Sequence, residues 1–351
     1  MQKNIFGELE TSGITIEQAA KTAKVSTATI RNWIKTGYLI QTGKGVVSQE
    51  SLENFIREIA GKEKLNARAN KLQKDEHDHK KVSAKTGELI QNFKGEKIGI
   101  EYENSLSNSH RNQEGVYYTP SWIVKDLFKN IKITRDVRFL DPCCGSGNFL
   151  IEAIRQGVAP ENVFGLDTDE NAVLIAKQRI KDEFDYETEN VKVGDFLHEA
   201  IQLSSEKHSF DLIFTNPPWG KKIEKSAKER YSILYGCGNS LDTTSLFIGA
   251  SFSILKQNGL LGFLMQEAFF NITTFEDIRR KVSSKRIIRF ADYDKAFKGL
   301  VTKAQAIVIE NTFANSLDII ECSSGENVFY RTLASFTENP KSIFNFWTNE
   351  T

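Results

Sequence analysis

After Gly115, short apolar runs alternate with helical patterns. The runs typical of buried strands are VRFLDPC, VFGLD, VKVGDFL, FDLIFTN, GLLGFLMQ, IIRFADY and AQAIVIENTFA. Between them, apolar residues recur every three or four positions in GNFLIEAIRQG, in DENAVLIAKQRIKDEF and around residues 246–256. Strands that alternate with amphipathic helices predict a doubly wound, Rossmann-like α/β sheet. In such sheets ligands bind at the carboxyl ends of the strands.

Two short helical patterns joined by a tight turn come first, and we predict a helix-turn-helix module over residues 1–60. Ser26 is a good N-cap for the second helix, and Ser48 for a third. The apolar stripes are Ile16, Ala19, Ala20 and Ala23, then Ile30, Trp33 and Ile34. The pattern resembles small MerR-type or excisionase-type DNA-binding modules. Between Lys21 and Lys44 every charged residue is basic, which suits phosphate contacts: Lys21, Lys24, Arg31, Lys35 and Lys44. A helical packing module with solvated lysines is the alternative.

Residues 61–106 are polar, and we interpret them as a helical linker. Its centre, NKLQKDEHDHKK, contains His77 and His79, but nothing nearby completes a set of metal ligands, so no metal site is expected. The four cysteines, two of them adjacent at Cys143 and Cys144, match neither a disulfide framework nor a zinc spacing.

Composition describes an ordinary globular protein. The 351 residues are 40% hydrophobic and 26% charged, and the formal net charge is zero. A nucleic acid must therefore bind to local basic patches rather than to an overall positive charge. No apolar run reaches membrane-spanning length, and the N-terminus lacks the apolar core of a signal peptide, so we expect a cytoplasmic protein.

The turn after the strand FLDPC carries the first candidate chemistry. Asp141 closes the strand, and Gly145, Ser146 and Gly147 let the backbone turn tightly against a ligand before a helix begins. A Walker-type phosphate loop needs a lysine where Asn148 stands, so the turn does not fit a nucleoside triphosphate.

A dinucleotide and S-adenosylmethionine both remain compatible with this turn. Asp167 lies 20 residues after Gly147, at the end of the next strand, where an acid holds the ribose of either cofactor. Asp141 favours S-adenosylmethionine, because a carboxylate repels a pyrophosphate but suits the ammonium of a methionine moiety. The third strand ends in Asp195 and Phe196, an acceptor for the adenine amino group and a ring beside it.

The strand FDLIFT ends in Asn216, Pro217, Pro218 and Trp219, where two prolines that lack N–H groups must stop it. An exocyclic aromatic amine is a poor nucleophile, because its lone pair is delocalised into the ring. The Asn216 side-chain oxygen and the Pro217 carbonyl can each accept one of its N–H groups and direct the lone pair at a sulfonium methyl group. Trp219 would then stack on a base flipped out of the duplex. A Pro-Pro turn beside a core tryptophan is the alternative.

Five motifs follow one another in the chain: GVYYTP (residues 115–120), FLDPCCGSGNFL, VFGLDTDENAV, VGDFL and FTNPPWG. Together they resemble the N6-adenine-specific DNA methyltransferases of restriction-modification systems, in the arrangement where the cofactor motifs precede the catalytic tetrapeptide. The resemblance covers about residues 107–314 and implies S-adenosylmethionine as cofactor and duplex DNA as substrate. Trp219 stands where Tyr or Phe is commoner, and Asp167 where the family often has Glu. Asn216 favours adenine, because cytosine-N4 enzymes usually carry Ser there.

The resemblance also assigns site residues. It implies cofactor contacts from Tyr118, Thr119, Pro120, Asp141, Gly145, Gly147, Asp167, Asp195, Phe196 and Phe247. Phe247 matches the ring that packs on the cofactor adenine, and Phe297 matches the aromatic that meets the flipped base opposite Trp219. An ordinary core phenylalanine explains either of these two positions equally well.

Three features favour DNA as the substrate: the helix-turn-helix, the YYTP motif ahead of the cofactor loop, and two basic stretches, GKKIEKSAKERY and RRKVSSKRIIR. Lys221 and Lys222 in the first stretch directly follow the catalytic corner and are placed to hold phosphates near a flipped base. Related enzymes methylate protein glutamine or ribosomal RNA with the same corner, so those substrates stay open. A non-catalytic DNA-binding regulator is a further alternative.

The motifs above do not include a domain that reads the target DNA sequence. We interpret residues 107–325 as the catalytic domain and residues 326–351 as a C-terminal segment that starts a missing target-recognition domain. We therefore expect either a fragment or an enzyme that relies on a separate specificity subunit, and recognition by the N-terminal module is the third alternative. A restriction endonuclease is the second candidate partner.

Overall fold

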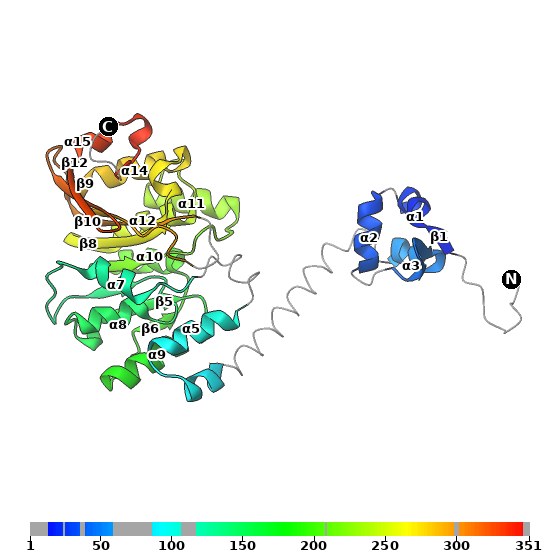
Figure 1. Ribbon diagram of the computed structural model, residues 1–351, viewed down its shortest axis with the longest axis horizontal. Coiled ribbons are helices and arrows are strands. Elements are labelled where there is room, and N and C mark those ends of the chain that lie inside the picture. Colours follow the sequence, from blue (N-terminus) through cyan, green and yellow to red (C-terminus); the bar gives the residue numbers. More distant parts are fainter. Residues whose placement is uncertain are drawn as a thin grey trace, which may run out of the picture. The chain divides into compact units, whose positions relative to one another are not determined.

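The computed structural model describes residues 13–23, 25–35, 39–58, 86–106, 117–207, 209–297 and 302–346. The chain divides into two compact units, Met1–Lys81 and Val82–Thr351 (Figure 1). Lys24, Gly115 and the tract that contains His77 and His79 lie outside the described residues. Within the described ranges, none of the helices combines the length and the apolar character needed to cross a membrane.

The first unit packs three helices against a small sheet. Its elements are β1 (Gly13–Thr15), α1 (Ile16–Ala23), α2 (Thr27–Lys35), β2 (Gln41–Gly43), β3 (Val46–Ser48) and α3 (Gln49–Glu58), and the strand order is β1-β3-β2. Both predicted N-caps are present: Ser26 Oγ accepts from the Thr29 N–H at 3.1 Å, and Ser48 Oγ from the Ser51 N–H at 3.2 Å. The unit has its own buried core of Ile16, Ala19, Ala20, Ile30, Trp33, Leu39, Val47, Leu52 and Phe55.

The described residues of the second unit form a mixed nine-stranded sheet with helices on both faces (Figure 1). The strands are β4 (Phe139–Asp141), β5 (Val163–Asp167), β6 (Val191–Val193), β7 (Phe210–Thr215), β8 (Leu255–Gln266), β9 (Lys285–Asp292), β10 (Ala304–Phe313), β11 (Ile319–Ser324) and β12 (Asn327–Thr332). The helices are α5 (Glu96–Ser105), α7 (Ser121–Phe128), α8 (Asn148–Arg155), α9 (Glu170–Phe184), α10 (Phe196–Ser205), α11 (Lys225–Tyr235), α12 (Thr243–Ile254), α13 (Ala268–Asn271), α14 (Glu276–Ser283) and α15 (Ala334–Thr337). Short 3-10 turns cover Pro160–Asn162, Thr273–Phe275 and Pro340–Ser342.

The strand order is β12-β11-β9-β10-β8-β7-β4-β5-β6. Strands β4 to β8 pair in parallel, as the alternation of strands and helices predicts. Strand β10 runs antiparallel between β8 and β9, and β12 runs antiparallel to β11. The α/β prediction is therefore confirmed, with a mixed rather than a wholly parallel sheet.

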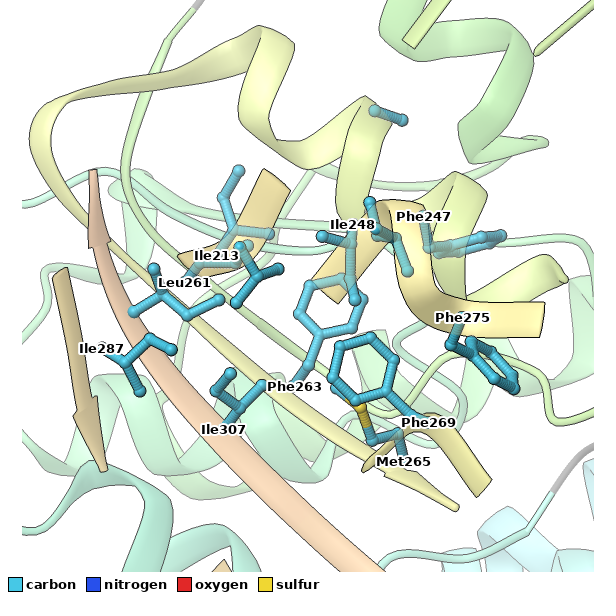
Figure 2. Packing of buried hydrophobic residues seen from close by; sticks show 14 of the residues in the cluster. Ile213, Phe247, Ile248, Leu261, Phe263, Met265, Phe269, Phe275, Ile287 and Ile307 are labelled. Carbon is cyan, nitrogen blue, oxygen red and sulfur yellow. The ribbon is translucent and has the colours of Figure 1, made fainter. Parts of the chain in front are cut away.

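The sheet separates two hydrophobic cores. Along β7, Ile213 faces a core shared with α10, α11, α12 and α14, while Leu212 and Phe214 face a core shared with α7, α8 and α9. This alternation follows from the two-residue period of a strand, and both faces are covered because a parallel sheet must be buried on both sides. Figure 2 shows the first core, in which Phe263 of β8 lies close to the side chains of α12.

The C-terminal segment belongs to the same core, whereas the sequence suggested a separate segment from residue 326. Strand β12 pairs with β11 along its length, and Phe336, Phe344 and Phe346 are buried. The Arg279 side chain is fully buried and donates to four backbone carbonyls, those of Phe269, Ile272, Lys341 and Ser342, at 2.6–3.0 Å. This guanidinium ties the C-terminal turn to the segment before α14.

Helix α5 also differs from the sequence interpretation, which placed residues 61–106 in a linker. Ile98, Tyr102 and Leu106 pack against Ala172 and Ile175 of α9 in a small buried cluster. Spacing of four residues puts the three side chains on one helix face. This part of the expected linker is therefore packed within the second unit, next to the carboxyl ends of β4 and β5.

Candidate active site

A pocket opens where the carboxyl ends of β4, β5 and β7 meet helix α5 and residues 117–119. Its empty volume, including the solvent at its mouth, is about 730 Å³. It is lined by Gly99, Tyr102, Glu103, Leu106, Tyr117, Tyr118, Thr119, Asp141, Cys143, Cys144, Gly145, Ser146, Asn148, Phe149, Asp167, Asp169, Ala172, Asn216 and Pro218. The location at the strand ends is the one expected for an α/β sheet.

The glycine turn between β4 and α8 forms the floor of this pocket. Gly145 and Gly147 have φ angles of 49° and 91°, a region that side chains with a Cβ rarely adopt. A Cβ on Gly147 would also lie 3.0 Å from the Cβ of Ala176, so glycine lets α8 begin against α9. Gly145 lines the pocket, whereas Gly147 supports the turn from behind.

Asp141 is buried at the end of β4, lines the pocket and has one unpaired carboxylate oxygen. Its Oδ1 accepts from Thr215 Oγ1 at 2.7 Å and from the Cys143 N–H at 3.1 Å. Its Oδ2 is buried and has no hydrogen-bond partner among the described residues. Burial raises the pKa of Asp141 to about 7, although the two hydrogen bonds oppose this shift. A cation in the pocket would satisfy this oxygen, so the residue fits the ammonium of a methionine moiety.

Asp167 shares its carboxylate with the glycine turn. Its Oδ2 accepts from the Gly145 N–H at 2.8 Å, and its Oδ1 from the Asp169 N–H at 2.9 Å. Burial raises its pKa to about 6, against the lowering effect of these two hydrogen bonds. Each carboxylate oxygen keeps a second lone pair, which allows it to accept from a ribose hydroxyl as well.

The side chain of Asn216 is held in one orientation at the end of β7. Its Nδ2 donates to Thr119 Oγ1 at 3.1 Å and to the Tyr117 carbonyl at 3.5 Å. Since a carbonyl can only accept, the NH₂ group must face this segment. The opposite atom, Oδ1, is buried without a partner in the part of the chain that the structure describes. The corner at the end of β7 therefore holds a hydrogen-bond acceptor in a fixed orientation.

Three aromatic rings gather at this corner. The rings of Trp219 and Phe297 meet edge to face, with centroids 5.0 Å apart and planes at 72°. The Tyr117 ring lies 6.0 Å from that of Trp219 and 6.3 Å from that of Phe297. Trp219 and Phe297 are both about 95% buried, so they close against one another in this state.

The structure does not bring all the expected cofactor residues to the pocket lining. Asp195 is exposed and caps α10, accepting from the Leu197 N–H at 3.0 Å. Phe196 and Phe247 are buried and pack on each other, with ring centroids 5.2 Å apart. Pro120 is the N-cap residue of α7.

The two lysines that follow Trp219 and Gly220 lie in different surroundings. Lys221 is half-buried, and its Nζ lies 3.5 Å from Thr168 Oγ1, next to Asp167 at the end of β5. Lys222 is exposed. The structure thus separates the pair, with Lys221 on the side of the expected ribose and Lys222 facing solvent.

Sequence reasoning missed the contribution of helix α5. Gly99, Tyr102, Glu103 and Leu106 line the pocket, and the Tyr102 hydroxyl donates to the Asp169 carboxylate. A Cβ on Gly99 would lie 2.4 Å from Ser146 Oγ, so the helix packs directly on the glycine turn. The four-residue spacing of Ile98, Tyr102 and Leu106 could have identified a packed helix in this polar stretch.

The fold and the strand-end pocket together define an S-adenosylmethionine-dependent methyltransferase. The family model described as N-6 DNA Methylase matches residues 94–310. The type II methyltransferase M.VspI of Vibrio sp. (strain 343) is 42% identical over 352 residues, which cover 99% of this chain and 86% of that protein. The chain belongs to the N-6 DNA methylase family.

Two further similarities are more partial. The type II methyltransferase M.BanIII of Aneurinibacillus aneurinilyticus is 27% identical over 55% of this chain and 38% of its own length. The crystal structure of a modification subunit of a putative type I restriction enzyme from Vibrio vulnificus YJ016 superposes with a TM-score of 0.55. At 15% identity, over 71% of this chain and 63% of that one, it shows the shared fold alone. The prediction of an S-adenosylmethionine-dependent adenine-N6 DNA methyltransferase is confirmed.

Proposed function

We propose that the protein methylates the N6 amino group of a flipped-out adenine at one target sequence in duplex DNA, as the modification enzyme of a restriction-modification system. The buried, unpaired Oδ1 of Asn216 carries this proposal. One amine N–H donates to this oxygen and the second to the Pro217 carbonyl, which turns the nitrogen lone pair toward the methyl donor. Orientation and fixed dipoles suffice here, because no strong base is needed to activate an amine.

When bound, S-adenosylmethionine supplies an electrophilic methyl group on a sulfonium. We assign Asp141 Oδ2 to its ammonium and the Asp167 carboxylate to its ribose. Tyr118 and Thr119, which line the pocket, enclose the methionine end beside Gly145. We assign the cofactor adenine to Asp195, Phe196 and Phe247. Asp195 and Phe196 follow β6, the strand next to β5, which ends in Asp167. Helix α5 adds Tyr102 and Glu103 to the wall of this site.

The aromatic corner is assigned to the target base. Trp219 offers the stacking surface and Phe297 the facing ring, with the Pro217–Pro218 pair holding the corner rigid. Because the two rings now meet edge to face at 5.0 Å, a base enters only as they separate. Lys222 is the candidate for a phosphate flanking the flipped base, since it is exposed directly after the corner.

The type II name of the 42% identical relative favours a restriction endonuclease as the functional partner of this enzyme. A separate specificity subunit is the second candidate. Expression of the chain in a host without adenine methylation, followed by mapping of modified bases, tests the assignment. We expect N6-methyladenine at one recurrent sequence. Modified cytosine, or adenine methylation without a shared sequence, would contradict it.

Cofactor affinity is expected to depend on pH through Asp141. Below its pKa of about 7 the carboxyl is neutral and no longer attracts an ammonium. Binding of S-adenosylhomocysteine, which keeps the ammonium, should therefore be about tenfold weaker at pH 6 than at pH 8. Calorimetry at both values measures this. Asp141→Asn should remove most of this pH dependence, whereas Asp136→Asn, at an exposed position, should keep it. An equal change of affinity between pH 6 and pH 8 in the wild type and both variants would refute the assignment of Asp141 to the ammonium.

The first unit is proposed to bind duplex DNA. Arg31 on α2 and Lys44 in the β2–β3 turn are exposed cations. Replacing both with glutamine in the full chain should weaken binding to mixed-sequence duplex and reduce the slope of log K against log salt by about 2. Fluorescence anisotropy over a salt series measures the slope. Lys192→Gln, on strand β6 of the second unit, is the matched control, and an unchanged slope in the double variant would exclude these contacts.

A further inference from the structure

Thr119 makes a contact that its expected place beside the cofactor does not require. Its side chain is buried, and its Oγ1 accepts from Asn216 Nδ2 at 3.1 Å, although the two residues lie 97 positions apart in the chain. The other contact of the same NH₂ group, to the Tyr117 carbonyl, is longer at 3.5 Å. The Thr119 hydroxyl is therefore the nearer of the two groups that fix which way the Asn216 amide faces.

Thr119 is itself held by a chain of hydrogen bonds. Its carbonyl accepts from Asn148 Nδ2 at 2.7 Å, and Asn148 Oδ1 accepts from Arg179 Nη1 at 2.8 Å. Arg179 is 4% exposed and also donates to the Ser146 carbonyl at 2.6 Å. One hydrogen-bonded frame thus connects Thr119 to Asn148 in the first turn of α8 and to the buried guanidinium of Arg179 on α9.

A second anchor fixes the same segment from helix α5. The Tyr118 N–H donates to Glu103 Oε2 at 2.6 Å. Residues 118 and 119 are consequently tied on one side to α5 and on the other to the glycine turn. A segment held at both ends can place a hydroxyl reproducibly, which is what the orientation of a neighbouring amide needs.

We propose that Thr119 is a positioning residue for methyl transfer: its hydroxyl, fixed through Asn148 and Arg179, holds the Asn216 amide so that Oδ1 faces the target amine. The inference rests on the proposed role of Asn216. It also links the two halves of the site, because the segment that lines the methionine end of the cofactor pocket sets the orientation of the catalytic amide.

Thr119→Val tests the inference, because valine keeps the shape of threonine and removes the acceptor. Single-turnover methyl transfer is measured with full-length enzyme in excess over whole-genome-amplified DNA, at saturating S-adenosylmethionine. We expect a rate constant 10- to 100-fold lower, since small misplacements of a reacting group cost about this much. Binding of S-adenosylhomocysteine should change less than threefold, and Thr119→Ser should recover most of the rate. Thr134→Val, at an exposed position before β4, is the matched control.

Two results would overturn the inference. One is a Thr119→Val rate constant equal to that of the wild type. The other is a loss that higher cofactor concentration restores, since Thr119 would then act only through cofactor binding. Asn148→Asp provides a second variant if valine prevents folding: it keeps an acceptor for Arg179 and removes the donor to the Thr119 carbonyl. Its rate should fall several-fold, and a wild-type rate would count against the frame.

Asn216→Ala separates this inference from the proposed function. If Asn216→Ala retains full activity, the role of the amide fails and the positioning argument fails with it. If Asn216→Ala is inactive while Thr119→Val matches the wild type, only the positioning argument fails. Where residual activity is measurable, adding Thr119→Val to Asn216→Ala should cause no further loss, because the group that Thr119 orients is already gone.

Discussion

Replacement of Asn216 by alanine is expected to lower the single-turnover rate of methyl transfer to DNA by about 10²- to 10³-fold, in line with the loss of a preoriented polar group at a reacting centre. The amide presents a buried acceptor with no other partner in the described residues, so nothing nearby can replace it. Cofactor binding should survive, because the carboxylates of Asp141 and Asp167 sit on other strands. Transfer of labelled methyl groups and calorimetry with S-adenosylhomocysteine measure the two properties separately.

Asn327→Ala is the matched control for this experiment, since Asn327 is exposed at the start of β12. It should transfer methyl groups at the wild-type rate. If Asn216→Ala kept more than a tenth of the wild-type rate constant, the amide would not be the group that orients the target amine. A parallel loss of cofactor affinity would instead indicate a damaged pocket.

Replacement of Arg279 by methionine is expected to lower the free energy of unfolding by about 3–5 kcal/mol, a loss typical of a broken buried polar network. Methionine fills much of the same space but leaves four backbone carbonyls, two of them in buried and two in partly buried hydrogen bonds, without their donor. Burial lowers the pKa of Arg279 to about 10, so the guanidinium remains charged at neutral pH and donates to all four. Chemical denaturation followed by tryptophan fluorescence measures the change.

Arg280 on the same helix provides the control. Its side chain is largely exposed and pairs with Glu276 four residues earlier, at 2.7 Å. Arg280→Met should change the free energy of unfolding by no more than about 0.5 kcal/mol, because exposed ion pairs contribute little. Equal effects of the two substitutions would show that the buried clamp does not hold the C-terminal turn.

Most of the sheet could be predicted from local patterns, and its order could not. Each apolar run, such as FDLIFT in β7, predicts a strand, because a strand whose two faces are both buried is apolar at nearly every position. The antiparallel position of β10 between β8 and β9 depends on pairing between distant segments, which no local pattern contains. The packing of the C-terminal segment is hidden for a similar reason. In the sequence Phe344 and Phe346 look like isolated residues, and only the fold shows that Arg279 ties their segment to the core.

The candidate site shows the same contrast between residues that a local pattern marks and residues that only the fold brings together. Asp141 and Asn216 could be singled out because each stands at the end of an apolar run and is followed by proline, which marks a turn. Asp167 could be singled out because it closes the next apolar run, 20 residues after Gly147. Residues that act through distant contacts gave no comparable signal. Arg179 sits in the middle of an amphipathic helix, and only the folded chain shows that it reaches the Ser146 carbonyl. Helix α5 was hidden by its polar composition, although the spacing of its apolar residues was present.

The central claim is that the amide of Asn216 directs a methyl group onto adenine N6. Its most direct test is transfer of labelled methyl from S-adenosylmethionine to mixed-sequence duplex DNA by the wild type and by Asn216→Ala, with separation of the product nucleosides. The account predicts label in N6-methyladenine for the wild type and none above background for the variant. Label in another nucleoside, or equal label from both proteins, would contradict it.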